Sequence, residues 1–251
     1  MWPYPKVVAH RGGGKLAPEN TLAGLRCGIE HGFRAVEFDV MLARDGVPVV
    51  MHDPYLGRTV PGSGNVSDYA AAELVMMDAG SWFAPRFKGE PVPLFTQFAD
   101  ACRENGVWMN VEIKPAPGFE EDTGRVVATL TRAMFGLQIA ADDPLAVPLF
   151  SSFSTVALAA AQLAAPDIPR ALLVDNPAPD WQQQAEKLGV VAIHANHKRL
   201  TPQFARAVRD AGFGLFCYTV NDPIRARELL GWGVDALCTD RIDIIAADFA
   251  G

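Results

Sequence analysis

The 251-residue chain lacks the sequence features of several large protein classes. No apolar run reaches the roughly 20 residues that cross a bilayer. Residues 1–6 have neither the basic part nor the long apolar part of a secretory signal. The 22 basic residues are outnumbered by 29 acidic ones, and the net charge of −7 provides no basic stripe for nucleic acid. We therefore expect a cytoplasmic protein that neither inserts into membranes nor binds nucleic acid.

Cysteine is scarce, and two common motifs are missing. The four cysteines, Cys27, Cys102, Cys217 and Cys238, are far apart and form no Cys-x-x-Cys pair, so we expect reduced, buried thiols. No Gly-x-Gly-x-x-Gly follows the first apolar run, which removes the usual signal of a dinucleotide site. No Gly-x-Ser-x-Gly motif is present either. We expect chemistry that needs no organic cofactor and no serine nucleophile.

Short, β-rich apolar runs alternate with helical patterns along the chain, which is typical of a parallel α/β sheet. Eight such units in 251 residues predict a TIM (β/α)8 barrel, with an open doubly wound sheet as the main alternative. The predicted strands are residues 7–10, 35–40, 108–113, 147–151, 171–174, 190–194, 214–218 and 235–238.

Helix-start and helix-end residues separate these strands. Asn20-Thr21 opens the first helix. Gly189, Gly212 and Gly231 stand where the end of a helix favours a left-handed residue. The other predicted helices are residues 122–134, 154–164, 179–188, 201–211 and 222–230.

A ninth β-rich run, residues 47–52, follows the second strand after only Arg44-Asp45-Gly46. This gap is too short for a parallel crossover. An Asp-Gly turn between two β-rich runs indicates a hairpin instead, which places His52 roughly opposite Asp39.

Residues 54–93, which follow this hairpin, are too long and too rich in Gly, Pro and Ser for an ordinary loop. We expect a single domain, residues 1–251, in which they form a small insertion over the C-terminal mouth of the barrel. Residues 69–77 form its one short helical patch. Trp82 and Phe83 either close over a ligand or form the insertion's own small core.

Carboxylates interrupt strands that should be buried and apolar. Glu37 and Asp39 are two residues apart, hence on one face of the second strand, and Glu112 lies near the end of the third. Three carboxylates at one rim must be protonated, paired with cations or bound to a metal ion. Oxygen ligands favour a hard cation such as Mg²⁺ or Ca²⁺ over zinc. A buried ion-pair network with Arg11 and Lys114 is the alternative.

Two histidines and two cations accompany these carboxylates. His10 and Arg11 close the first strand, Lys114 follows the third, and His52 closes the hairpin. On a barrel these positions converge on one rim. A hard cation with Arg11 and Lys114 suits a phosphate diester, because each neutralises oxygens that gain charge in the transition state. Two histidines can share the proton transfers, one as base and one as acid.

Several spaced motifs carry a family resemblance that runs from about residue 3 to 248. The chain resembles the glycerophosphodiester phosphodiesterases, most closely the cytosolic bacterial type. The matching stretches are Val8-Ala9-His10-Arg11-Gly12-Gly13-Gly14, Ala17-Pro18-Glu19-Asn20-Thr21-Leu22, Glu37-Phe38-Asp39-Val40, Asp45-Gly46, His52-Asp53, Asp78-Ala79-Gly80-Ser81-Trp82-Phe83, Glu112-Ile113-Lys114-Pro115, Ser151-Ser152-Phe153, Tyr218-Thr219-Val220-Asn221 and Gly233-Val234-Asp235.

The resemblance implies a TIM barrel that hydrolyses glycerophosphodiesters, such as glycerophosphocholine or glycerophosphoethanolamine, to sn-glycerol 3-phosphate and an alcohol. A divalent cation is implied, with Mg²⁺ preferred and Ca²⁺ or Mn²⁺ as alternatives. Carried over by motif, His10 and His52 resemble the acid/base pair. Glu37, Asp39 and Glu112 resemble the metal ligands. Arg11, Lys114, Phe153 and Tyr218 resemble the substrate contacts. Many relatives have Trp where this chain has Tyr218, which concerns only the leaving-group side.

Two routes stay open for this chemistry: attack by a glycerol hydroxyl through a cyclic phosphate, or direct attack by water. The sequence does not assign the base to either histidine, and it does not predict an oligomeric state. Two other functions also stay open. One is a phospholipase D-type or lysophospholipid phosphodiesterase, and the other is a non-catalytic barrel that binds phosphodiesters.

Further polar residues have simpler structural interpretations. His194 and His197 are expected either as hydrogen-bonded histidines at the barrel rim or as substrate contacts, rather than as metal ligands. Capping of the first helix explains Glu19 and Asn20. As residues of a motif shared with the family, they are also expected to brace the loop after the first strand. Asp240 ends the last strand and is a candidate to support the site indirectly. His31, at a helix end, is expected to meet free carbonyls.

Overall fold

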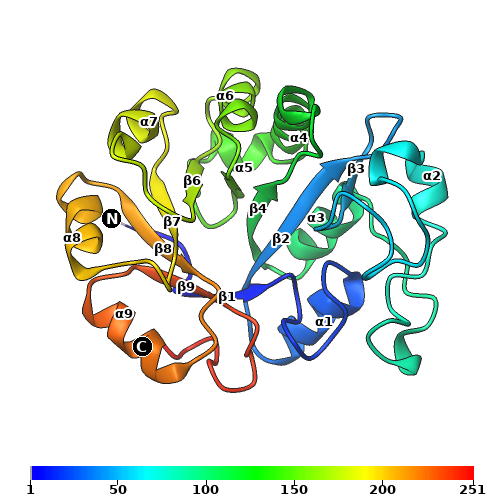
Figure 1. Cartoon of the computed structure of the whole chain (residues 1–251), viewed down its shortest axis with the longest axis horizontal. Coiled ribbons are helices and arrows are strands. Elements are labelled where there is room, and N and C mark those ends of the chain that lie inside the picture. Colours follow the sequence, from blue (N-terminus) through cyan, green and yellow to red (C-terminus); the bar gives the residue numbers. More distant parts are fainter. Residues whose placement is uncertain (1) are drawn as a thin grey trace.

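A computed structural model of the protein describes residues 2–251, which form a closed parallel β-barrel surrounded by helices (Figure 1). Because β1 pairs with both β2 and β9, the sheet closes on itself, and the predicted TIM barrel is confirmed. The barrel strands are β1 (Val7–His10), β2 (Ala35–Leu42), β4 (Trp108–Ile113), β5 (Leu149–Ser152), β6 (Arg170–Val174), β7 (Ala192–Asn196), β8 (Gly214–Tyr218) and β9 (Ala236–Thr239).

The outer helices are α1 (Leu22–Glu30), α3 (Phe95–Glu104), α4 (Glu120–Met134), α5 (Gly136–Ala140), α6 (Thr155–Ala164), α7 (Trp181–Lys187), α8 (Pro202–Asp210) and α9 (Pro223–Gly231). Four of the outer helices, α1, α6, α8 and α9, begin at a polar residue whose side chain caps the helix. The hydroxyl of Thr21 accepts a hydrogen bond from the Gly24 amide, and Ser154, Thr201 and Asp222 cap later helices in the same way.

Helix α3 is absent from the predicted elements, although the sequence carries its signal. Phe95, Phe98, Ala99 and Cys102 recur at helical spacing and are all buried.

Two predicted positions also need correction. Strand β7 begins two residues later than expected, and the left-handed glycine after α9 is Gly233 rather than Gly231, because α9 continues through Gly231.

Side chains alternate between the outer and the inner face of each strand, so the core has one layer under the helices and one inside the barrel. On β2, Val36, Phe38 and Val40 face outward, where helices cover them, so Glu37 and Asp39 face the barrel interior. Toward the amino ends of the strands, aromatic side chains fill the interior. They include Trp2, Tyr4, Trp108 and Phe216. The polar residues of the site are therefore gathered at the opposite, carboxyl-terminal rim.

The predicted hairpin is present. Strand β3 (Pro48–Val50) pairs antiparallel with β2, and the Met51 amide donates to the Asp39 carbonyl. His52 thus comes one residue after the position opposite Asp39. The hairpin brings His52 to the rim that carries Asp39.

Residues 51–94 follow β3 and contain only short elements: η1 (Val66–Asp68), α2 (Ala71–Leu74) and η2 (Pro85–Phe87). Their apolar side chains, such as Val66 and Leu74, pack on Met41 and Val49 of the hairpin. In Figure 1 this segment flanks the barrel beside β3, α3 and α1. Met41 lies two residues after Asp39, so these contacts are on the hairpin face that also carries Glu37 and Asp39. The segment therefore packs beside the rim at β3, and a position over the mouth stays a prediction.

The aromatic residues of this segment pack on one another. Trp82 and Phe83 meet edge to face at 5.6 Å, and Phe83 meets Phe87 at the same distance. The indole of Trp82 donates to the Ala79 carbonyl. These contacts favour the interpretation as a local core over that of a lid.

All four cysteines are free thiols; Cys102, Cys217 and Cys238 are buried, and Cys27 is half-buried. None of the helices described within residues 2–251 combines the length and apolar character needed to cross a lipid bilayer.

Candidate active site

Three carboxylates meet at the carboxyl-terminal rim because of the strand register. Asp39 on β2 lies beside Glu112 on β4, and Glu37 lies beside His10 on β1. One oxygen from each of Glu37, Asp39 and Glu112 lies within 4.8 Å of the other two, and all three residues are buried. The structure therefore brings together the three predicted metal ligands.

The loop after β1 bends sharply at the site. Arg11 has a φ of +50°, in the left-handed region that non-glycine residues seldom adopt. Its amide donates to Glu37. Gly14 follows at a φ of +53°, where a Cβ would lie 2.2 Å from the Asp240 carbonyl oxygen. Glycine is required there because the loop passes directly against the end of β9.

Both predicted cations pair with Asp39. The Lys114 ammonium lies 3.2 Å from one carboxylate oxygen and Arg11 Nε lies 3.4 Å from the other. Burial by itself disfavours ionisation, but Lys114 and Arg11 outweigh it and hold the pKa of Asp39 below its usual range. Asp39 is therefore the most acidic of the three carboxylates.

The other two carboxylates experience the opposite balance. Burial, together with the negative charges of Asp39 and Glu112, raises the pKa of Glu37 well above its ordinary value. Burial and Asp39 raise the pKa of Glu112 to about 7, although Lys114 donates to it at 3.0 Å. Positive charge from two side chains does not neutralise three buried carboxylates, which leaves the cluster suited to one more cation.

His10 is oriented by Asp240 across the closure of the barrel. His10 Nδ1 donates to Asp240 at 2.6 Å, and the second Asp240 oxygen accepts from Asn221 at 2.8 Å. A carboxylate only accepts, so this contact fixes the ring tautomer and leaves Nε2 facing Glu37 at 3.7 Å. The pKa of Asp240 falls to about 2 because the contact with His10 outweighs its burial. The expected indirect role of Asp240 corresponds to this contact.

His52 is oriented by the residue that follows it. His52 Nδ1 donates to Asp53 at 2.7 Å, and the other Asp53 oxygen accepts from Arg58. Burial lowers the pKa of His52, and Arg11 and Lys114 lower it further against the opposing charge of Asp39. A neutral imidazole with a free Nε2 can accept a proton.

Arg58 was not among the predicted site residues, yet it connects the two histidine-bearing loops. It donates to both oxygens of Glu19, at 2.8 and 2.7 Å, and Glu19 also accepts from Arg11 at 2.7 Å. The chain Arg11–Glu19–Arg58–Asp53 thus links the loop after β1 to the loop after β3. An arginine soon after His52-Asp53 is a faint signal in the sequence, and no local pattern indicates its partners.

Glu19 and Asn20 do not cap α1, so that part of the prediction is wrong, whereas the pair of Glu19 with Arg11 agrees with the expected bracing of the loop after β1. Thr21 provides the side-chain cap. Asn20, at a φ of +57°, turns inward; its amide donates to Asp39 at 2.9 Å and its carbonyl oxygen accepts from the Asp39 amide. The left-handed backbone of Asn20 serves this contact, which fixes the orientation of the Asp39 carboxylate.

Phe153 and Tyr218 form the opposite side of the rim. Their rings meet edge to face at 5.8 Å, and the Tyr218 hydroxyl donates to the Val174 carbonyl. Phe153 is 48% exposed. The pair offers an apolar wall facing the charged side of the mouth.

The remaining histidines lie outside this cluster. His194 is fully buried inside the barrel and stacks on Phe216 at 4.4 Å, so the expected rim position is wrong for it. Burial lowers its pKa to about 3. His31 donates to the Cys27 carbonyl at the end of α1, as expected. Within residues 2–251, neither His194 nor His197 belongs to a group of side chains spaced for a metal ion.

This chain is similar in sequence and fold to known proteins. The model of the "Glycerophosphoryl diester phosphodiesterase family" matches residues 10–244. A glycerophosphodiester phosphodiesterase from Caldanaerobacter subterraneus is 29% identical, over 93% of each chain. A solved phosphodiesterase from Oleispira antarctica, in complex with the product sn-glycerol-3-phosphate, is 35% identical, with a TM-score of 0.87, 97% coverage of this chain and 96% of that one. A glycerophosphodiester phosphodiesterase from Agrobacterium tumefaciens is 28% identical, with a TM-score of 0.76, 97% coverage of this chain and 99% of that one.

Proposed function

The chain belongs to the glycerophosphoryl diester phosphodiesterase family, and on that premise we propose that it hydrolyses glycerophosphodiesters to sn-glycerol 3-phosphate and an alcohol. Glycerophosphocholine and glycerophosphoethanolamine are the proposed substrates. The family makes the chain a phosphoric diester hydrolase; the substrates, the metal ion and the residue roles are the proposed part. The product bound to the Oleispira antarctica relative supports sn-glycerol 3-phosphate as the product here.

The observation that carries this proposal is the composition of one rim. A buried cluster of three carboxylates has two cations and two histidines around it, and each histidine presents Nε2 because a carboxylate holds Nδ1. Such a rim can bind an anionic diester and move two protons without a nucleophilic side chain.

Glu37, Asp39 and Glu112 fit a hard divalent cation, which we propose to be Mg²⁺, with Ca²⁺ or Mn²⁺ as alternatives. Their donor atoms are all oxygens within 4.8 Å of one another. The raised pKa values of Glu37 and Glu112 mean that a cation would relieve repulsion among buried carboxylates. When bound, the ion would supply Lewis-acid stabilisation of the phosphate and of the attacking hydroxyl.

The side chains of the rim bind the substrate and transfer the protons. Arg11 and Lys114 neutralise phosphate oxygens. We assign the base to His52, whose neutral ring accepts the proton of the attacking hydroxyl, either that of glycerol or that of water. His10 then protonates the oxygen of the departing alcohol. Phe153 and Tyr218 contact the glycerol or the alcohol. In the cyclic route, water then opens the cyclic phosphate: His10 takes a proton from that water and His52 returns its proton to the glycerol oxygen, so both histidines regain their starting states. In the direct route, His52 releases its proton to solvent and His10 takes one up before the next turnover.

The domain organisation is part of the same proposal. Residues 1–251 form one catalytic domain, and residues 54–93 form a small insertion whose first part provides Arg58. The cytoplasmic location stays a prediction.

The test is release of sn-glycerol 3-phosphate from several glycerophosphodiesters after chelation and after separate restoration of Mg²⁺, Mn²⁺ and Ca²⁺. We expect loss of activity on chelation and recovery with Mg²⁺. Full activity in excess chelator would contradict the metal assignment. Lysophosphatidylcholine serves as the comparison substrate, because faster turnover of it would favour the lysophospholipid alternative. Binding of all diesters without turnover would favour a non-catalytic barrel.

A further inference from the structure

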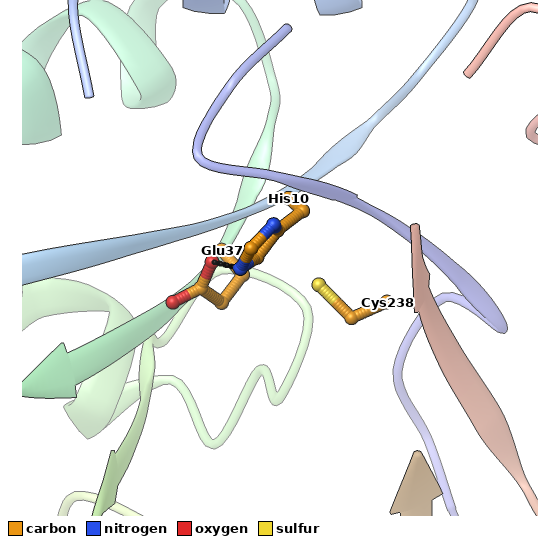
Figure 2. Close-up of side chains that lie close together, drawn as sticks. All are labelled: His10, Glu37 and Cys238. Carbon is orange, nitrogen blue, oxygen red and sulfur yellow. Dashed lines mark ion pairs between the residues drawn. The ribbon is translucent and has the colours of Figure 1, made fainter. Parts of the chain in front are cut away.

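A buried thiol lies beside the proposed catalytic centre and has no part in the proposed reaction. Cys238 on β9 is fully buried, and Figure 2 shows its sulfur directed toward His10 and Glu37. A nitrogen of His10, an oxygen of Glu37 and the sulfur of Cys238 all lie within 4.8 Å of one another. This group differs from the carboxylate cluster because it offers nitrogen, oxygen and sulfur.

His10 is held in the way that metal-binding histidines commonly are. Its Nδ1 donates to Asp240 at 2.6 Å, and Nε2 lies 3.7 Å from Glu37. Histidines that bind metals commonly donate their second nitrogen to a carboxylate in this way, which fixes the tautomer and the ring plane. Ligand atoms around a tetrahedral zinc ion lie about 3.3–3.8 Å apart, given its bond lengths. The His10–Glu37 separation lies within that range.

The nitrogen of His10 and the sulfur of Cys238 favour a soft ion at this group. Thiolate and imidazole favour Zn²⁺ and Cd²⁺, whereas Mg²⁺ prefers oxygen ligands and retains water. Three protein ligands would leave one position for water or for a substrate oxygen.

We propose that His10, Glu37 and Cys238 form a binding site for a soft divalent cation, Zn²⁺ or Cd²⁺, and that its occupation inhibits the enzyme. Binding replaces the thiol proton with a metal–sulfur bond and releases that proton to water. Nε2 of His10 is then occupied and cannot protonate a departing alcohol. Glu37 is shared with the hard-ion site, so both sites draw on one carboxylate. The inhibition rests on the proposed role of His10, whereas the binding does not.

The binding test is a Cd²⁺ titration in excess Mg²⁺, followed by the ultraviolet charge-transfer band of a cadmium–thiolate bond. We expect the band to saturate at one equivalent in the wild type and to be lost in Cys238→Ala. Cys217→Ala, which changes another fully buried thiol, is the matched control and should keep the band. Cys27→Ala should also keep it; this control is needed because Cys27 Sγ lies 3.8 Å from His31 Nδ1 on the surface.

A band that survives in Cys238→Ala, or that disappears in Cys27→Ala, would overturn the site. So would Cd²⁺ binding without any band, because the ion would then occupy only the carboxylate cluster. If Cys238→Ala does not fold, Cys238→Ser replaces it, since a hydroxyl of similar size gives no such band.

The inhibition test measures release of sn-glycerol 3-phosphate against Cd²⁺ or Zn²⁺ concentration, with each variant compared with its own rate without added soft metal. We expect the half-inhibitory concentration to rise at least tenfold in Cys238→Ala and to stay unchanged in Cys217→Ala. Equal inhibition of the two variants would contradict the proposal. A protein that gives the band but releases no product would refute the proposed function and leave the metal site supported.

Discussion

The two histidines of the proposed acid/base pair are held in the same way by different parts of the molecule. His10 depends on Asp240, which is 230 residues away and meets it only because β9 closes the barrel against β1. His52 depends on its neighbour Asp53, whose other oxygen accepts from Arg58. The barrel wall itself holds the first pair. The second lies on a long connecting segment and needs Arg58 as an anchor to Glu19.

The largest expected effect comes from removing either histidine. His10→Ala and His52→Ala should each lower kcat by about 10²–10⁴-fold, because each deletes one proton transfer. The double variant should lose little more, since the two act as a unit. Steady-state release of sn-glycerol 3-phosphate measures this. His31→Ala, at the surface end of α1, is the control and should keep near wild-type rates. Near wild-type activity in either site variant would refute the assignment.

Replacing Asp240 and Asp53, the carboxylates that hold the two histidines, compares the two histidine–carboxylate pairs directly. We expect Asp240→Asn to lower kcat about 10²-fold and Asp53→Asn about 10-fold, because Arg58 already compensates much of the Asp53 charge. KM should change little in both, since neither side chain is proposed to touch substrate. Asp243→Asn, which breaks a surface pair with Arg241, is the matched control. A rise in KM at constant kcat would contradict a positioning role.

A smaller effect is expected for Arg58, which links the His52–Asp53 pair to Glu19. Arg58→Ala should lower kcat/KM about tenfold or less, because the side chain is 43% exposed and its ion pairs are partly screened. Arg58→Lys should restore only part of the loss, since one ammonium cannot bridge Glu19 and Asp53 as a guanidinium does. Arg44→Ala removes another arginine pair of the same segment, with Glu73, and should have no effect on activity. Equal losses in Arg44→Ala and Arg58→Ala would indicate general loosening of the segment.

The smallest effect is a displacement of the pH profile. Burial and the nearby cations lower the pKa of His52 from its ordinary 6.5, so kcat/KM should begin to fall only below that pH, when the ring becomes protonated. Asp53 opposes this lowering through its hydrogen bond. Asp53→Asn should therefore move the acidic limb to lower pH, whereas Asp240→Asn should leave it in place. The measurement is kcat/KM from about pH 5 to 8 at saturating Mg²⁺. An acidic limb that moves only in Asp240→Asn would reverse the assignment of base and acid.

The sequence predicted those site residues whose placement depends only on the pattern of one strand or one turn. Glu37 and Asp39 stand out because a charged pair at spacing two is unusual in a buried strand. His52 could be placed to within one residue of its position opposite Asp39 because an Asp-Gly hairpin sets its own register. Asp53 lies next to His52 in the chain, and its contact is local.

The residues that were missed or misread all have partners far away in the chain. Asn20 looks like a helix cap but turns to Asp39, because the left-handed backbone before α1 directs it inward. Arg58 joins Glu19 across 39 residues. His194 follows β-rich residues as a rim histidine would, yet a two-residue shift of β7 places it inside the barrel.

The sequence by itself determined the barrel, the alternation of its strands and the identity of the charged rim, because strand periodicity and turn chemistry act over a few residues. Only the tertiary structure decided which of the charged side chains pair with one another. Closure of β9 on β1 gives His10 its carboxylate and brings Cys238 beside it. The packing of residues 51–94 against the hairpin decides that Arg58 reaches the rim. Both depend on burial of apolar surface between segments distant in the chain, and no local pattern records that.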